Sequence, residues 1–186
     1  MKLGISKLWD DMKHRRYRFR QWIGVAFMIV MAWLAVPHAW TLAIGIPIIG
    51  IGVLLRLWAA GYIKKSQELE VRGPYGFVRH PQYLGNTLIA VGFSVASGHL
   101  WGVAAWALVF YVFYLPAIER EDEKLHRRFG EVWEEWKETT PAVFPLHWPR
   151  KLSGLRIREW SAVRAVKNGE ILWVMLVALM AVGVCL

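Results

Sequence analysis

A polar loop over 67–80, just before the apolar run at 83–97, carries side chains suited to binding a ligand. Glycine and proline within 73–76 mark turns, and Pro81 suits the first turn of a helix, so His80 lies beside an N-cap. A helix N-terminus presents free N–H groups and positive potential to an anion. We expect His80, Tyr75 and Tyr83 to contribute to such a site, with contact to lipid headgroups as the alternative.

An acidic cluster at 119–123 directly follows the fourth apolar run. Carboxylates at a membrane boundary are functional when they turn inward, because their desolvation is costly. A solvated acidic helix start is the alternative for this cluster taken alone. Antiparallel hairpins would bring the start of the third run and the end of the fourth to one face, so we expect Glu121 to meet His80 and Tyr83 across one cleft.

The segment after this cluster has the pattern of an amphipathic surface helix. Its apolar residues recur at steps of three and four and are interrupted by Gly130. These residues are Leu125, Phe129, Val132, Trp133 and Trp136. We interpret the segment as a helical lid that closes over the cleft.

Four or five apolar runs qualify as membrane-spanning helices, which need roughly 20 mostly apolar residues. The runs are 21–40, 41–62, 83–97, 100–118 and 171–186. The first four form two hairpins, with turns around Pro37 and around Gly98. The fifth, at 16 residues, either spans or merely inserts. The fold class we predict is an all-α integral membrane protein with two transmembrane hairpins, a fifth C-terminal helix and a cytoplasmic lid.

The charge pattern predicts the orientation of these helices. Seven Lys or Arg residues lie within 1–20, four within 63–80 and eleven within 119–170, whereas the turns near Pro37 and Gly98 carry none. Since cytoplasmic loops collect Lys and Arg, we place the N-terminus and both large polar segments in the cytoplasm. The net charge of +9 is then a sign of membrane topology and not of nucleic-acid binding.

Arg56 is the ionisable residue that lies deep in an apolar run. An intramembrane charge is a functional hypothesis by default. Because Arg56 is within about two turns of the cytoplasmic end of its run, snorkelling of the guanidinium toward the headgroups is the rival interpretation.

Several other chemistries are not supported by the sequence. The histidines show neither an HExxH motif nor another paired ligand spacing, so we expect no metal site. Cys185 stands alone, which excludes an intrachain disulfide and a thiolate zinc cluster. No glycine-rich phosphate loop, GxSxG motif or βαβ pattern is present.

Four motifs together resemble the isoprenylcysteine carboxyl methyltransferase and phospholipid methyltransferase superfamily. They are the GPY element at 73–75, RHPQYLG at 79–85, EDEKL at 121–125 and FG at 129–130, followed by Pro141 and Pro145. The resemblance covers roughly half of the chain, from about Arg56 to Pro145. It implies a polytopic enzyme that uses S-adenosylmethionine at the cytoplasmic membrane face.

The resemblance also implies site residues. The cofactor-binding set would comprise Gln67, Glu68, Leu69, Glu70, Tyr75, His80, Pro81, Gln82, Tyr83 and Glu121. The implied organisation is one membrane-embedded domain over 1–186. It has a basic interfacial segment at 1–20, four transmembrane helices within 21–118, a cofactor-binding and lid segment at 119–145, and a basic segment with the last apolar helix at 146–186.

Two departures from the superfamily pattern concern the substrate. The acidic pair is usually Glu-Glu and is Glu121-Asp122 here. Isoprenylcysteine enzymes resemble one another in an arginine four residues before the first glutamate, where this chain has Ala117. Arg56, Arg79 or Arg120 would be candidates to supply that charge, with Ala117 as a specificity position. The simpler interpretation is a lipid amine, a thiol or another lipophilic acceptor.

Three functions therefore remain open from the sequence. The first is methyl transfer from S-adenosylmethionine to a lipophilic acceptor that enters from the lipid bilayer. The second is a membrane-embedded reductase of the sterol type with NADPH. The third is a membrane partner protein without catalytic activity. No residue is assigned a catalytic role, and no oligomeric state is predicted.

Overall fold

The computed structural model describes residues 19–63, 68–145 and 160–185, and these residues contain helices and loops but no strand. The first described helix is Phe19–Trp33, and α2 follows at Ala39–Tyr62. The short turn η1 (Gly73–Gly76) leads into α3 (Pro81–Ala96). Next come α4 (Trp101–Val109), the π-helical turn η2 (Phe110–Tyr114), α5 (Leu115–Phe129), α6 (Glu131–Thr139), α7 (Ala162–Lys167) and α8 (Glu170–Cys185).

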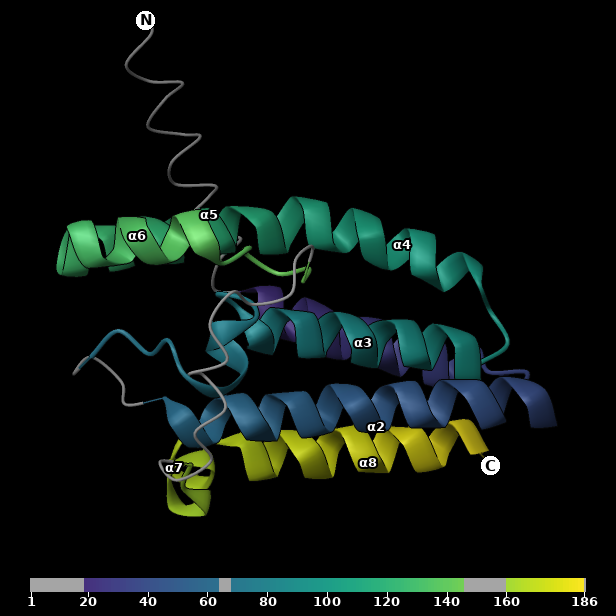
Figure 1. Ribbon diagram of the computed structural model, residues 1–186. Helices are drawn as coiled ribbons and strands as arrows, with labels where there is room; N and C mark the ends of the chain where they lie inside the picture. Colours follow the sequence, from purple (N-terminus) through teal and green to yellow (C-terminus); the bar gives the residue numbers. More distant parts are fainter. Residues whose placement is uncertain (1–18, 64–67, 146–159, 186) are drawn as a thin grey trace, which may run out of the picture.

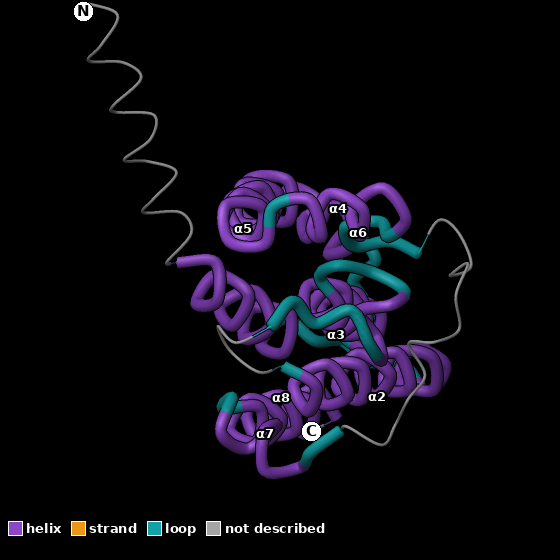
Figure 2. Tube along the Cα trace, turned by 60° about the vertical axis from the view of Figure 1, so that its left-hand side comes forward, coloured by secondary structure: helices purple, strands orange, loops and turns teal. Residues whose placement is uncertain are grey.

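The long helices run along a common direction. In Figure 1, α8 lies against α2, α3 lies on the other side of α2, and the continuous helix α4–η2–α5 forms the outermost layer. Figure 2 shows the same helices closer to end-on, with α2 beside both α3 and α8. One apolar cluster joins the first helix, α2, α3 and α8, and a second joins α3 to the α4–η2–α5 helix.

The close approach of α2 and α3 depends on glycines spaced by seven residues on each helix. A Cβ atom on Gly52 would lie 2.8 Å from the backbone oxygen of Gly85, and one on Gly92 would lie 2.9 Å from that of Gly45. Small residues allow helix backbones to pack this closely in membrane proteins. The α2–α3 pair is accordingly the most extensive helix contact in the described part of the chain.

Within the described residues, two helices are long and apolar enough to cross a membrane, Ala39–Tyr62 and the continuous Trp101–Phe129. Phe19–Trp33 and Glu170–Cys185 are shorter apolar helices. Large apolar side chains stand exposed along these elements, among them Trp33, Leu54, Leu108, Leu172 and Leu179. Exposed apolar surface of this kind suits contact with lipid. The number of spans that we expected, four or five, stays a prediction.

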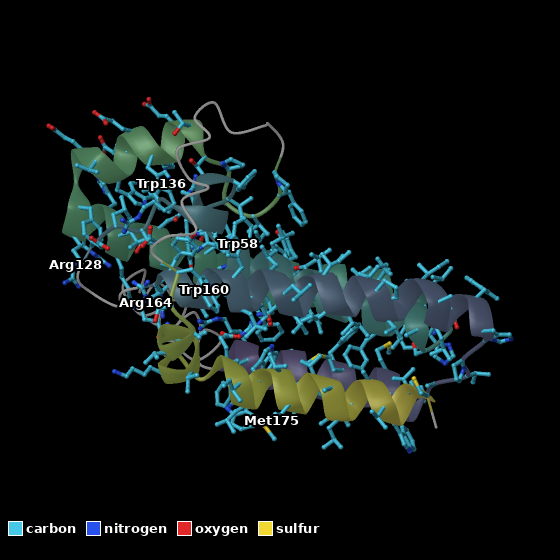
Figure 3. All side chains as sticks on the ribbon, turned by 60° about the horizontal axis from the view of Figure 1, so that its bottom comes forward. Trp58, Arg128, Trp136, Trp160, Arg164 and Met175 are labelled. Carbon is cyan, nitrogen blue, oxygen red and sulfur yellow. The ribbon has the colours of Figure 1, made fainter. Side chains whose placement is uncertain are left out.

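Figure 3 shows the opposite character at one end of the molecule, where oxygen-bearing side chains gather around α6. The basic segment expected at 1–20 lies outside the described residues except for its last two positions. Residues 146–159 of the expected C-terminal segment also lie outside the described residues.

Two expected helix boundaries are wrong. The first helix ends at Trp33 and not near 40, because Pro37 lacks an N–H and the following loop bonds to the other hairpin: Val36 N donates to the Ser97 oxygen at 2.9 Å. The fourth run does not end at 118 but continues through the acidic cluster to Phe129. Pro116 is accommodated directly after the π-helical turn, and Gly130, with φ of +53°, ends the helix.

Arg56 forms a buried ion pair that joins α2 to α8. Its Nη2 lies 2.8 Å from Glu170 Oε1, its Nε lies 3.1 Å from Oε2, and the two residues are 5% and 4% exposed. The guanidinium also donates to Asn86 Oδ1 of α3 and lies 4.8 Å from the ring centre of Trp173. Arg56 therefore does not snorkel to a headgroup layer, since its charge is neutralised inside the helix bundle.

Replacing Gly52 with alanine is expected to destabilise the protein by about 1–3 kcal/mol, because the added Cβ would collide with the backbone of α3. Gly50→Ala is the matched control on the same helix, since a Cβ there meets nothing within 4 Å. The control should be neutral or mildly stabilising. Thermal unfolding in detergent compares the two, and equal losses would contradict the packing argument.

Replacing Arg56 with methionine is expected to cost about 3–5 kcal/mol, because the Glu170 carboxylate would stay buried without its partner. The double variant Arg56→Met/Glu170→Met should recover most of this stability, since no uncompensated charge remains. Unfolding of both variants in the same detergent measures the difference. A double variant less stable than the single one would show that the ion pair is not the origin of the loss.

Candidate active site

A cavity of about 310 Å³ lies at the polar end of the helices, next to the N-terminus of α3. Its walls come from the first helix, the segment after α2, η1, the start of α3, α5 and α6. The lining residues are Arg20, Ile63, Glu68, Leu69, Glu70, Tyr75, Arg79, His80, Pro81, Gln82, Tyr83, Glu121, Lys124, Leu125 and Trp136. A cavity of this size can hold a small organic ligand.

His80 is placed at this cavity by backbone hydrogen bonds on both sides of it. It is the N-cap residue of α3, and Pro81 occupies the first helical position, where its missing N–H costs nothing. The N–H groups of Arg79 and His80 donate to the carbonyl oxygens of Pro141 and Ala142, both at 2.8 Å. The loop before α3 is thereby fastened to the chain that follows α6.

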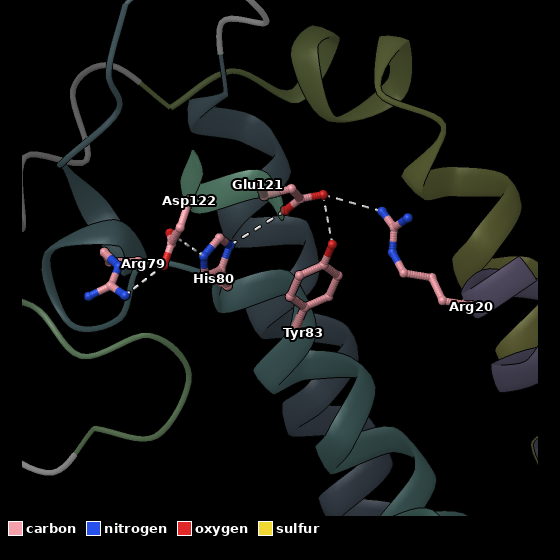
Figure 4. Close-up of polar contacts among 6 residues, drawn as sticks. All are labelled: Arg20, Arg79, His80, Tyr83, Glu121 and Asp122. Carbon is pink, nitrogen blue, oxygen red and sulfur yellow. Dashed lines mark hydrogen bonds and ion pairs between the residues drawn. The ribbon is translucent and has the colours of Figure 1, made fainter. Parts of the chain in front are cut away.

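Glu121 faces the cavity between groups from three other elements (Figure 4). The Tyr83 hydroxyl donates to Glu121 Oε1 at 2.7 Å, and Arg20 Nη2 of the first helix lies 3.3 Å from the same oxygen. His80 Nδ1 lies 3.5 Å from Glu121 Oε2. The carboxylate keeps about 30% of its side-chain surface exposed, so it is held in position and remains accessible from the cavity.

Asp122, the next residue on α5, points to the other side of His80. Its Oδ1 lies 2.9 Å from His80 Nε2, and its Oδ2 accepts a hydrogen bond from Arg79 Nη2 at 2.8 Å. The imidazole therefore lies between two carboxylates, one at each ring nitrogen.

The charge of His80 follows from this position. Burial disfavours the imidazolium, but the hydrogen bonds to Asp122 and Glu121 outweigh burial and raise the pKa of His80 above its ordinary value of 6.5. Below this raised pKa His80 is an imidazolium, and both ring nitrogens then donate, to Asp122 and to Glu121. Because the pKa is raised, the ion pairs of His80 with Asp122 and Glu121 stabilise the fold. This stabilisation is fully present below pH 6.5 and is lost as the pH rises through the pKa of His80 in the folded state.

The opposite wall combines carboxylates with aromatic rings. Arg72 Nη2 lies 2.8 Å from Glu68 Oε1, and Arg72 Nε lies 2.8 Å from Glu70 Oε1, so one guanidinium orients both acids. Tyr75 is buried, and burial together with the charge of Glu70 raises its pKa well above the ordinary value, which keeps the hydroxyl neutral. Trp136 Nε1 of α6 donates to the Tyr75 backbone oxygen at 3.3 Å.

The structure brings together nine of the residues expected to bind a cofactor. Glu68, Leu69, Glu70, Tyr75, His80, Pro81, Gln82, Tyr83 and Glu121 all line the cavity. Gln67 lies outside the described residues. The meeting of His80 and Tyr83 with Glu121, expected from the hairpin geometry, is present in the contacts described above. That these residues bind a cofactor stays a prediction.

Of the four positions considered for the substrate, Arg79 lines the cavity and the other three lie elsewhere. Arg56 is paired with Glu170, and Ala117 is fully buried in the apolar cluster around Tyr83 and Tyr114. Arg120 is on α5 but does not line the cavity. The structure therefore gives no support to a role for Arg56 or Arg120 as the missing cavity charge.

Some cavity residues were not expected from the sequence. Arg20 was assigned to a basic interfacial segment, although a cation at the polar end of an apolar helix was a usable signal. The expected cofactor-binding set also lacks Ile63, Arg79 and Lys124, whereas Leu125 and Trp136 belong to the segment expected to form a lid over the cleft. Among residues 19–63, 68–145 and 160–185, no group of three His, Cys, Asp or Glu side chains is placed to hold a metal ion.

Comparison with known proteins identifies a family that matches most of the chain and several relatives of similar sequence. The model of the phospholipid methyltransferase family matches residues 19–132. The nickel-cobalt-cadmium resistance protein NccN of Alcaligenes xylosoxydans xylosoxydans is 32% identical over 70% of this chain and 65% of its own length. The cobalt-zinc-cadmium resistance protein CzcN of Cupriavidus metallidurans is 33% identical over 76% of this chain and 69% of its own length.

Enzymes with named reactions match over shorter stretches. The protein-S-isoprenylcysteine O-methyltransferase of Schizosaccharomyces pombe is 30% identical over 44% of this chain and 35% of its own length. Delta(14)-sterol reductases are distant relatives, and the mouse protein matches over 18% of its length. No solved structure matches significantly. Because the family model covers more than half of the chain, this membrane protein belongs to the phospholipid methyltransferase family, in the superfamily that includes the isoprenylcysteine methyltransferases.

Proposed function

We propose that this protein transfers a methyl group from S-adenosylmethionine to a lipophilic acceptor at the cytoplasmic face of the membrane. One observation carries the proposal: the cavity holds Glu121 between Tyr83, Arg20 and His80, and all four residues belong to the part of the chain that matches the methyltransferase family. Its position at the polar end of apolar helices supports an acceptor that reaches the cavity from the bilayer.

The chemistry of the cavity walls fits this cofactor, which carries a carboxylate, an ammonium group, a sulfonium and an adenosine. Arg20 and the protonated form of His80 suit the carboxylate, and Glu121, Glu68 and Glu70 suit the ammonium group. Apolar and aromatic walls suit the adenosine and, through cation–π contact, the sulfonium. These walls are Leu69, Tyr75, Leu125 and Trp136.

The bound cofactor would supply an electrophilic methyl group. The residues of the chain then act mainly by alignment, because bringing a nucleophile and a methyl group into line replaces a bimolecular encounter with a prepositioned one. Tyr83 and Arg20 hold the Glu121 carboxylate from two helices, and Trp136 and Leu125 add apolar surface to the cavity wall. An acceptor that arrives as a free amine, a thiolate or a carboxylate already has the lone pair that attacks the methyl group and would need no dedicated base.

The proposed orientation follows from charge. The cavity lies beside the loop 63–80 and the segment that begins at 119, the two regions after the N-terminus that are rich in Lys and Arg. Basic loops face the cytoplasm in most membrane proteins. The cavity would then open to the cytoplasmic side, where S-adenosylmethionine is made.

Calorimetric titration of the detergent-purified protein with S-adenosylmethionine and S-adenosylhomocysteine tests the proposal before any acceptor is known. NADPH serves as the parallel ligand for a reductase. We expect saturable binding of the first two and none of NADPH. Binding of NADPH, or of none of the three, would refute the proposed reaction.

The Glu121→Gln variant should bind both methionine-derived ligands about 10–100-fold more weakly, because a hydrogen bond to a charged group is worth about 1.5–3 kcal/mol. Glu123→Gln is the matched control, since Glu123 lies on the same helix, is 68% exposed and does not line the cavity. Unchanged affinity of Glu121→Gln in a protein that unfolds at the normal temperature would remove Glu121 from the ligand site.

A further inference from the structure

Asp122 belongs to the acidic pair of the superfamily pattern but does not line the cavity. Its side chain is 14% exposed, and each carboxylate oxygen has a cationic partner. Oδ1 contacts His80 Nε2 and Oδ2 contacts Arg79 Nη2, at 2.9 and 2.8 Å. The two neighbouring acids thus face different surroundings, since Glu121 is turned to the cavity and Asp122 away from it.

The first consequence concerns His80. The charged and titratable groups around its ring are Asp122 and Glu121 on α5, Arg79 beside it in the chain, Tyr83 stacked at 5.5 Å on α3, and Arg20 of the first helix, which contacts Glu121. Asp122 makes the shorter of the two ion pairs with the ring, at 2.9 against 3.5 Å. The charge and the ring orientation of His80 therefore depend chiefly on Asp122.

The second consequence concerns residues 137–142, which comprise the last turn of α6 and the three residues after it. We call them the strap, because Pro141 and Ala142 bond to the loop before α3. Arg79 Nη1 donates to the backbone oxygens of Thr140 at 2.7 Å and of Lys137 at 3.3 Å. These carbonyls lie at the C-terminal end of α6, where a cation is favourable. Since Asp122 holds Arg79, it also holds the strap, and the strap directly follows Trp136 of the cavity wall.

We propose that Asp122 is a positioning residue: through His80 it keeps a cation at the cavity, and through Arg79 it keeps α6 in place over the same cavity. The proposal rests on the proposed function for the identity of the ligand. It assigns different roles to the two acids, with Glu121 touching the ligand and Asp122 acting through His80 and Arg79.

Calorimetric titration with S-adenosylhomocysteine over about pH 5.5 to 9 tests this assignment. In the unmodified protein, affinity should fall as the pH rises through the raised pKa of His80, because the imidazolium is lost. In Asp122→Asn the strongest partner of the imidazolium is gone while burial remains, so the pH at which affinity falls should drop by about one unit or more. Asp122→Glu keeps the charge and should restore the midpoint, and Glu123→Gln should leave it unchanged.

Two results would overturn the proposal. One is a midpoint in Asp122→Asn equal to that of the unmodified protein. The other is complete loss of binding at every pH in a folded Asp122→Asn protein, since Asp122 would then contact the ligand itself. If Asp122→Asn does not fold, Asp122→Ser also removes the charge and should give the same shift.

A measurement without ligand separates this proposal from the proposed function. The pKa of His80 in the ligand-free protein can be followed by NMR of labelled histidine, with His80→Gln identifying the resonance. It should lie above 6.5 in the unmodified protein and fall in Asp122→Asn. If S-adenosylhomocysteine does not bind at all, the proposed function fails, and an unchanged His80 pKa in Asp122→Asn would independently refute the role of Asp122.

Discussion

Two adjacent carboxylates at the end of an apolar helix are the constraint on which the rest of the site depends. Glu121 and Asp122 follow the apolar part of Trp101–Phe129, where an uncompensated charge is costly. The chain meets this cost with donors from other elements: Arg20 from the first helix, Arg79 and His80 from the loop before α3, and Tyr83 from α3 itself. Compensating the charge brings these elements together at one end of the bundle.

The two carboxylates meet different partners, because the side chains of neighbouring positions on a helix point about 100° apart. One acid therefore faces the cavity and the other faces the loop and the strap. The close α2–α3 contact supports this arrangement, since it fixes α3 and with it the position of His80 and Tyr83 relative to α2. A second buried pair, Arg56 with Glu170, follows the same principle deeper in the bundle and joins α8 to the helices of the family-matched region.

The helices and the core of the site can largely be predicted from local sequence signals. Apolar runs and turn residues indicated the helices, and antiparallel hairpins predicted the meeting of His80 with Glu121. Partners distant in sequence were not predictable in this way: Glu170 lies 114 residues from Arg56, and Arg20 lies 101 residues from Glu121. The end of the first helix was missed because apolar length alone does not show that Val36 bonds to Ser97. The seven-residue glycine spacing of α2 and α3 is a local signal in the sequence for the close contact of these two helices.

The C-terminal end of α2 carries a consequence for the boundaries of the folded unit. Its last backbone oxygens accept hydrogen bonds from Trp160 Nε1 to Leu57 at 3.3 Å, from Ser161 N to Gly61 at 3.0 Å and from Asn168 Nδ2 to Ala60 at 2.9 Å. The C-terminal end of α2 is therefore capped by a segment that lies about a hundred residues later in the chain. A fragment limited to 19–132, the stretch that matches the methyltransferase family, would leave these three oxygens without the donors that cap α2 in the full chain.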